Sequence, residues 1–336
     1  MPKTIGIPRT LAYYTYFPLW KIFLEELGLN VVLSRQTNKD ILEMGVRDAV
    51  NDACLPIKIY HGHVADLKDR VDYLFVPRMI SADGRSTFCP KFLGLPDMVR
   101  FSATDLPPLL DLDYRMRRGR ISTFLFFKTL GEQLGSPFRQ VSRGYLQARR
   151  VFQAYREWQY AGLPPEEAMR EAELSGRPRL PAREEKQQAG LRIAVLGYPY
   201  AVYDPFINAN LLQILKDAGC EVWTVERVSD KMLRKMSREL EEDLYWYYSN
   251  RVVWAGLHYL SRADSLDGLI HVTAFACGPD AMVDKLLELE SRDRGQVPFL
   301  KITIDEHSGD AGLVTRLEAF LDMLKVRQRP GLTPGV

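Results

Sequence analysis

The sequence has no excess of either charge and no long apolar run. Each absence excludes a class of partner or location. It carries 45 basic and 43 acidic residues, a formal net charge of +2, so its bulk electrostatics indicate neither nucleic acid nor an anionic membrane as a partner. No apolar run reaches the roughly 18 residues of a membrane-spanning helix, and the N-terminus lacks the pattern of a signal peptide. We therefore expect a cytoplasmic protein.

Cysteine is scarce, with four in 336 residues, which in a reducing compartment favours thiols or metal ligands over disulfides. A proline follows Cys89 directly and follows Cys54 and Cys277 after one intervening residue. A proline stiffens the backbone and often opens a helix, whose positive end favours a thiolate. Three such thiolates suggest a metal cluster. For any single cysteine a buried small hydrophobe is the commoner role, and we keep that interpretation for Cys220.

Two segments of the chain repeat one order of elements. Residues 4–34 and 191–225 each show a strand, a Gly-x-Pro turn, a helix, a glycine and a second strand, which is a βαβ unit. Further buried strands are expected at residues 73–76, 269–273 and 299–303. The pattern predicts an α/β fold with two doubly wound, flavodoxin-like parallel-sheet domains.

The middle of the chain is predicted to be helical. Residues 114–172 show helical spacing with interleaved aromatic and basic residues, and residues 175–188 have the composition of an exposed linker. A second helical block with an aromatic cluster is expected at 230–260, where packing is the commoner role of the aromatics. The predicted division is an N-terminal α/β domain with Cys54 and Cys89 (1–113), a helical connector and linker (114–189), and a C-terminal α/β domain with Cys277 (190–330).

This scaffold puts two of the cysteines at the carboxyl ends of strands. Cys277 follows the strand at 269–273, and Cys89 follows the strand at 73–76 across a loop. Ligands of open α/β sheets bind at this edge. Cys54 lies between two expected helices, and the three cysteines form no compact run. A site that uses all three must therefore be assembled between the two domains.

Eight stretches are distinctive in wording and in order. They are IGIPR (5–9), YFPLW (16–20), DACLP (52–56), HGH (61–63), FCPKFLGLP (88–96), FACGP (275–279), IDEHSGDAG (304–312) and RLEAF (316–320). In these stretches the sequence resembles the acyl-CoA dehydratase activase-related proteins. That family is related to the iron-sulfur subunits of 2-hydroxyacyl-CoA dehydratases and to double-cubane cluster proteins. The resemblance covers nearly the whole chain except the helical connector.

The resemblance implies that Cys54, Cys89 and Cys277 ligate one [4Fe-4S] cluster, with the remaining iron held by something other than a cysteine. An iron of this kind can bind substrate oxygen, whereas a cluster with four cysteine ligands only relays electrons. The implied function is low-potential electron transfer or reductive activation of a small substrate, an acyl-CoA among the candidates, in an oxygen-sensitive protein of anaerobic metabolism. Double-cubane relatives use six cysteines, so we expect one cluster per protomer, and a homodimer would hold two.

The resemblance also implies partners. In the related dehydratases an ATP-driven activator delivers the electron, and this sequence lacks the phosphate-binding pattern G-x-x-x-x-G-K-S/T, so an ATP step would reside in an activator or electron-donor protein. Two alternatives stay open: a non-catalytic carrier of the cluster or of electrons, which includes a protein that binds an activator ATPase, and a structural zinc protein that uses the same thiolates. Neither a catalytic residue nor a CoA pocket is assigned, and enzymatic activity stays open.

Five polar residues near these motifs each have two interpretations. His61 and His63 lie two positions apart on an expected helix and face different ways, which favours hydrogen bonding to the cluster region or solvent exposure over joint metal ligation. Asp305, Glu306 and His307 follow a strand and suit either proton transfer and hard-metal binding or a capped turn before the next helix.

Basic residues near the cysteines are similarly ambiguous. Lys58, Arg78 and Lys91 can offset the charge of a thiolate-ligated cluster or attract a CoA phosphate, although lone charges are typically solvated. The arginines at 115, 117, 118 and 120 can dock an acidic electron donor or simply form a solvated face.

Overall fold

The chain folds into two compact units. In the computed structural model the residues described are 2–115, 121–178, 190–294, 297–306 and 310–327. Unit 1 comprises Met1–Leu180 and Leu244–Tyr248, and unit 2 comprises Pro181–Asp243 and Ser249–Val336. Each unit has its own parallel sheet and its own helices. The predicted boundaries at 113 and 189 stay a prediction.

Unit 1 is built on a four-stranded parallel sheet in the order β2-β1-β3-β5. The centre of this sheet is apolar, since Ile5 and Leu74 are fully buried. After β1 the chain enters helix α1, and Gly28, with a positive φ of 80°, then turns it into β2. The elements of this core are β1 (Thr4–Ile7), α1 (Tyr13–Glu26), β2 (Asn30–Leu33), β3 (Tyr73–Phe75) and β5 (Leu109–Leu110).

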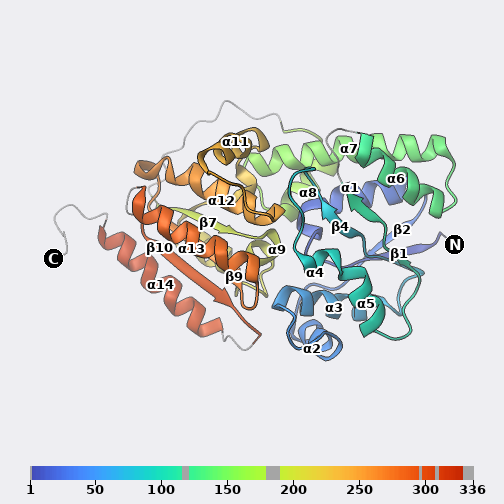
Figure 1. Cartoon of the computed structure of the whole chain (residues 1–336), viewed down its shortest axis with the longest axis horizontal. Coiled ribbons are helices and arrows are strands. Elements are labelled where there is room, and N and C mark those ends of the chain that lie inside the picture. The colour runs from blue at the N-terminus through green and yellow to red at the C-terminus, as the bar shows by residue number, and fades with distance from the viewer. Residues whose placement is uncertain (1, 116–120, 179–189, 295–296, 307–309, 328–336) are drawn as a thin grey trace. The chain divides into compact units, whose positions relative to one another are not determined.

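A group of short helices and a two-stranded parallel sheet carry the cysteine motifs of unit 1 (Figure 1). They are α2 (Lys39–Asp48), α3 (Leu55–Leu67), β4 (Arg78–Ser81), α4 (Pro90–Leu93), α5 (Leu95–Ser102) and β6 (Asp113–Arg115). Helices α2 and α3 pack backbone to backbone. A Cβ on Gly62 would lie 1.8 Å from the Ile41 carbonyl oxygen, and one on Gly45 would lie 1.9 Å from that of Lys58, so only glycine fits at either position.

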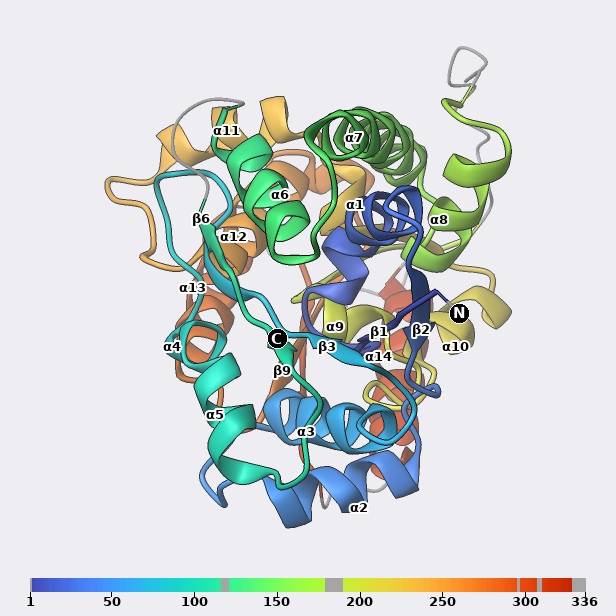
Figure 2. The same cartoon turned by 90° about the vertical axis from the view of Figure 1, so that its right-hand side faces the viewer.

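The predicted helical middle of the chain forms α6 (Ile121–Gln133), α7 (Phe138–Tyr160) and α8 (Pro165–Leu174). In Figure 2, α7 lies along α1, and α6 and α8 lie beside these two helices. Gly144 and Ala148 of α7 are buried and small, which allows this close approach. The buried hydroxyl of Tyr155 donates to the carbonyl of Tyr14 at 2.5 Å and fixes α7 on α1. These helices are therefore part of unit 1.

Unit 2 repeats the layout with a four-stranded parallel sheet in the order β10-β9-β7-β8. Numbered within each unit, both sheets have the strand order 2-1-3-4, so the predicted duplication and the flavodoxin-like α/β class are confirmed. The elements are β7 (Arg192–Gly197), α9 (Pro199–Tyr203), α10 (Leu211–Asp217), β8 (Glu221–Thr224), α11 (Asp230–Met236), α12 (Tyr247–Leu260), β9 (Gly268–Ala274), α13 (Gly278–Asp293), β10 (Phe299–Ile304) and α14 (Asp310–Arg327), with 3-10 turns at Val225–Arg227, Ser237–Glu239 and Ala263–Ser265. No helix in the described part of the chain is long and apolar enough to cross a bilayer.

The structure divides the helical block predicted at 230–260 into α11 and α12. The segment Leu244–Tyr248, which ends in the first two residues of α12, belongs to unit 1, where Trp246 forms a parallel bridge with Thr87. The ring of Tyr248 packs on Phe88, 5.3 Å between centroids. The expected packing role is confirmed for Tyr248 and Trp254, which are buried, whereas Tyr245 is 70% exposed.

Candidate functional site

Each of the three proline-linked cysteines is the N-cap residue of a helix. Cys54 precedes α3, Cys89 precedes α4 and Cys277 precedes α13, and each helix has a proline within its first turn. The proline leaves no backbone N–H to satisfy at its position, and the remaining first-turn N–H groups point toward the cysteine. The local geometry predicted from the Cys and Pro spacing is therefore present at all three positions. The four cysteines, all within the described residues, are thiols outside any disulfide.

Cys54 and Cys89 share one electrostatic environment in unit 1. Burial raises the pKa of the Cys54 thiol to about 11, the Ile57 N–H lowers it, and ionised Cys89 raises it further. Burial also raises the pKa of Cys89, against the N–H groups of Phe92 and Lys91. The positive charge of Lys91 acts on both sulfurs in the direction of the thiolate. The two thiols therefore lie close enough to interact.

The first-turn N–H groups favour the thiolate, as expected, but burial outweighs them in this pair and the net effect is a raised pKa at both sulfurs. A bound cation would reverse the balance, since metal ligation deprotonates a coordinating thiol. Two thiols with N–H groups and a lysine around them suit the anionic sulfurs of either an iron-sulfur cluster or a zinc site. Within the described residues no three His, Cys, Asp or Glu side chains are grouped to hold a metal ion, so this pair is not a ligand set by itself.

Cys277 lies in unit 2, in the short connection from β9 to α13. Its N–H donates to the Ala274 carbonyl at 3.1 Å, and its own carbonyl accepts from the Ala281 N–H at 3.0 Å. Ala276, directly before it, has a φ of 63°, a left-handed conformation that costs energy for a residue with a Cβ. The side chain of Cys277 is half-buried at the carboxyl end of its strand, as predicted. Convergence of Cys277 with Cys54 and Cys89 stays a prediction.

The other sequence candidates mostly have structural roles. Cys220 is buried beside β8, consistent with its interpretation as a small hydrophobe. His61 and His63 are buried in α3, where ring nitrogens pair with the hydroxyls of Ser102 at 2.9 Å and Thr37 at 3.1 Å. Burial lowers the pKa of His63 to about 3. Solvent exposure is therefore wrong for both, and their hydrogen bonds go to hydroxyls, while the expected link to a cluster region stays a prediction.

The basic candidates divide into one residue at the thiols and two elsewhere. Lys91 is the residue whose charge reaches both Cys54 and Cys89. Arg78 instead joins α4 and α5, since it donates to the Leu93 carbonyl at 2.6 Å and to Asp97 at 2.8 Å. Lys58 is buried within α3, so it is not the solvated side chain that lone charges usually are.

The structure describes only some of the remaining polar candidates. His307 and the arginines at 117, 118 and 120 lie outside the described residues. Asp305 accepts from the backbone N–H of Glu306 at 2.6 Å, as in a capped turn. Arg115 is in β6.

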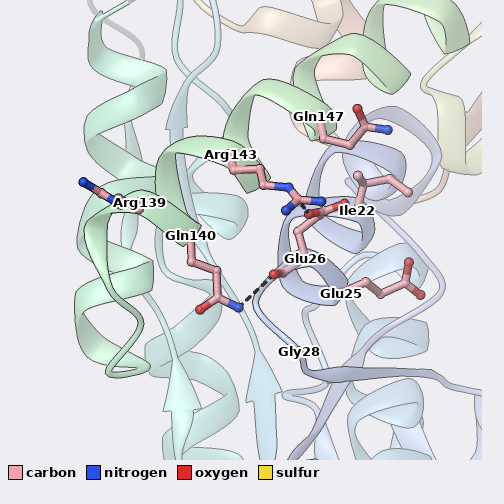
Figure 3. Close-up of a pocket in the computed structure, with 8 residues that line it drawn as sticks. All are labelled: Ile22, Glu25, Glu26, Gly28, Arg139, Gln140, Arg143 and Gln147. Atoms are coloured by element: carbon pink, nitrogen blue, oxygen red, sulfur yellow. Dashed lines mark hydrogen bonds and ion pairs between the residues drawn. The ribbon is translucent and has the colours of Figure 1, made fainter.

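Two hollows lie in unit 1. The larger, about 600 Å³, lies between the end of α1 and the start of α7 (Figure 3). There Gln140 donates to the Glu26 carbonyl at 3.0 Å and Arg143 pairs with the Glu26 carboxylate at 3.6 Å, so its charges are largely compensated. The smaller cavity, about 20 Å³, has apolar walls from the carboxyl ends of β1 and β3 and from the cysteine-capped helices α3 and α4. Thr10 Oγ1 and Trp20 Nε1 in its wall have no hydrogen-bond partner in the part of the chain that the structure describes, and a cavity of this size has room for one water.

One polar cluster in unit 2 was not predicted from the sequence. His271 is fully buried in β9, and Asp280 and Asp284 of α13 lie beside its two ring nitrogens. The available signal was a single histidine inside the apolar run Leu269–Val272, followed by two aspartates four residues apart on one helix face.

Fold and site together define a two-unit, flavodoxin-like α/β protein with cysteine-capped helices. Residues 4–228 match the family model described as CoA enzyme activase uncharacterised domain. Residues 157–324 match the D-component of 2-hydroxyglutaryl-CoA dehydratase. The chain therefore belongs to the CoA enzyme activase family related to the 2-hydroxyacyl-CoA dehydratases, and the resemblance inferred from the motifs is confirmed.

Comparisons with other proteins add no functional argument. No curated protein matches the chain. Among solved structures, a periplasmic solute-binding protein of an ABC transporter from Actinobacillus succinogenes, with bound D-allose, is 12% identical, with 98% of this chain and 94% of that chain covered and a TM-score of 0.20. The C-terminal domain of glucosamine-fructose-6-phosphate aminotransferase from Francisella tularensis is 9% identical, with 96% and 85% covered and a TM-score of 0.22.

Proposed function

We propose that this protein is an iron-sulfur protein of the 2-hydroxyacyl-CoA dehydratase type in which Cys54, Cys89 and Cys277 ligate one [4Fe-4S] cluster. The observation that carries the proposal is the shared placement of these three cysteines, each the N-cap residue of a helix with proline in its first turn. Cys220, which lacks that placement, is a packed side chain. Membership of the dehydratase-related family supports the same three ligands.

The residues around the thiols suit a cluster with a net negative charge. First-turn N–H groups and Lys91 favour the ionised sulfurs of Cys54 and Cys89, and hydrogen bonds to sulfur are among the features that set a cluster's potential. When bound, the cluster supplies low-potential electrons and, at an iron without a cysteine ligand, a Lewis acid for substrate oxygen.

The family relation supports an acyl-CoA as the small substrate and an ATP-dependent activator or electron donor as the partner. A homodimer, which would hold two clusters, is the assembly we propose. A cytoplasmic location in an anaerobic cell follows from the sensitivity of such clusters to oxygen.

Metal analysis of the full chain tests the ligand set. We expect protein purified without oxygen to be brown, to contain iron and sulfide in equal amounts, and to be bleached by dithionite. Cys54→Ala, Cys89→Ala and Cys277→Ala should each lose most of the iron, whereas the matched control Cys220→Ala should retain it. A colourless preparation that holds zinc alone would falsify the redox proposal and leave a structural zinc protein.

Spectroscopy with substrate separates a catalyst from a carrier. If reduced protein is mixed with a panel of 2-hydroxyacyl-CoA esters, an active site reached by substrate should change the cluster spectrum. An unchanged spectrum across the whole panel would assign the protein to electron or cluster transfer.

A further inference from the structure

The buried cluster around His271 joins three elements of unit 2. His271 Nδ1 lies 3.1 Å from Asp284 Oδ1, and Nε2 lies 3.3 Å from Asp280 Oδ1. Lys301 Nζ, from the neighbouring strand β10, lies 2.6 Å from Asp284 Oδ2. Strand β9 pairs with β10 and packs against α13 (Figure 1), so the cluster ties the helix to the sheet.

The geometry favours a charged imidazole. A neutral histidine has one N–H and one lone pair, and here the lone pair would face a carboxylate oxygen. Both ring nitrogens face carboxylates, and among the described residues His271 Nε2 and Asp280 Oδ1, 3.3 Å apart, have no hydrogen-bond partner besides each other. Two cations, His271 and Lys301, then balance two anions, Asp280 and Asp284. Burial alone would lower the pKa of His271, but the two aspartates raise it to about 9.

This cluster brackets the segment that carries Cys277. Strand β9 ends at Ala274 and α13 begins at Gly278, so only residues 275–277 connect them. His271 lies in β9 before the connection, and Asp280 lies in the first turn of α13 after it. The strained φ of 63° at Ala276 can persist only if both ends of the connection are held.

We propose that His271, paired with Asp280 and Asp284, is a positioning residue that fixes the connection 275–277 and so sets the orientation and reactivity of the Cys277 thiol. His271 cannot itself touch a substrate, because it is fully buried. We call the pairing of His271 with Asp280 and Asp284 the clamp. Its relevance to cluster binding rests on the proposed function, whereas its existence does not.

Asp280→Asn in the full-length, metal-free protein tests the clamp. The substitution keeps the side-chain shape but removes one partner of His271 and one negative charge from the first turn of α13. The rate of iodoacetamide labelling is then measured for each cysteine peptide by mass spectrometry. Cys277 should react about two- to fivefold faster, because a charge at a helix end changes the fraction of a thiol present as thiolate by this order. Labelling of Cys54, Cys89 and Cys220 should stay unchanged.

The matched control is Asp267→Asn. Asp267 precedes the amino end of β9, where it pairs with Arg192 at 3.2 Å, so its loss should leave the Cys277 labelling rate at the wild-type value. In unmodified protein, ¹⁵N spectra of the histidine rings, assigned with His271→Gln, should show an imidazolium at pH 7.5.

Two results would overturn the clamp: a neutral His271 ring at pH 7.5, or a folded Asp280→Asn variant whose Cys277 reacts at the wild-type rate. If the variant does not fold, the ring spectrum of the unmodified protein decides. These measurements need no metal, so failure of the iron analysis would contradict the proposed function and leave the clamp standing, and the converse also holds.

Discussion

The two units share one strand order but give their buried histidines opposite properties. His63 in unit 1 and His271 in unit 2 are both fully buried. The ring of His63 pairs with the hydroxyl of Thr37, and burial lowers its pKa to about 3. Two aspartates overcome the same burial at His271 and raise its pKa to about 9. The difference shows that topology and burial leave the charge of a histidine open and that its partners decide it.

The cysteines show the same contrast. In unit 1, backbone N–H groups and Lys91 lower the thiol pKa of Cys54 and Cys89 against the effect of burial. In unit 2 Cys277 is single, half-buried and bordered by a strained residue and a charged cluster. The same helix-capping pattern thus has backbone N–H groups and a lysine around it in unit 1 and a buried charged cluster next to its connection in unit 2.

The largest effect is expected from the glycine contact in unit 1. Gly62→Ala would bring a Cβ within 1.8 Å of the Ile41 carbonyl oxygen, so unfolding in urea should show a loss of about 3 kcal/mol or more. The control, Gly312→Ala in α14 of unit 2, meets no atom within 4 Å and should instead gain about 0.5 to 1 kcal/mol. Equal stabilities of the two variants would contradict the close packing of α2 on α3.

Opposite pH dependences should separate the two histidines. The folded pKa of His63 lies below the unfolded value near 6.5. Its contribution to the free energy of unfolding is therefore present above that pH and is lost as pH falls toward 3. The folded pKa of His271 lies above the unfolded value, so its contribution is present below about pH 6.5 and is lost as pH rises through 9.

Urea unfolding between pH 4 and 9.5 measures both changes, each on the order of 1 to 3 kcal/mol. His63→Asn should flatten only the acid side and His271→Gln only the alkaline side. A wild-type curve without an alkaline decline would argue against the charged His271.

A smaller effect is expected where the chain passes from unit 1 to unit 2 within α12. The Tyr248 hydroxyl lies 3.0 Å from Thr15 Oγ1 in unit 1, and the next residue, Ser249, lies 2.7 Å from the Tyr198 hydroxyl in unit 2. Tyr248→Phe and Tyr198→Phe should each cost about 1 kcal/mol. Limited proteolysis should show cleavage increased in unit 1 for the first variant and in unit 2 for the second, and the same pattern for both would contradict the division at this residue.

The smallest effect concerns Lys91. Lys91→Gln removes a positive charge near two sulfurs, so iodoacetamide should label both Cys54 and Cys89 about two- to threefold more slowly, while Cys277 is unaffected. The control Lys285→Gln, in α13 and paired with Glu288 at 3.1 Å, should slow neither. A change at only one of the two cysteines would show that they do not share an environment.

Much of the fold could be predicted because its signals are local. Apolar runs at 73–76, 269–273 and 299–303 became β3, β9 and β10, and the repeated βαβ pattern gave both sheets their first two strands. The block at 230–260 was predicted less well, because its segment Leu244–Tyr248 belongs to unit 1 and no local pattern indicates to which unit a segment belongs.

The sequence by itself determined where the cysteines lie on their helices, because proline and helix capping act within one turn. It also determined the family, because the motifs are contiguous. Only the tertiary structure decided the protonation of these groups. The raised pKa values of Cys54 and Cys89, the neutral His63 and the charged His271 depend on burial and on partners far apart in the chain, and such partners meet only when the sheet and its helices pack together.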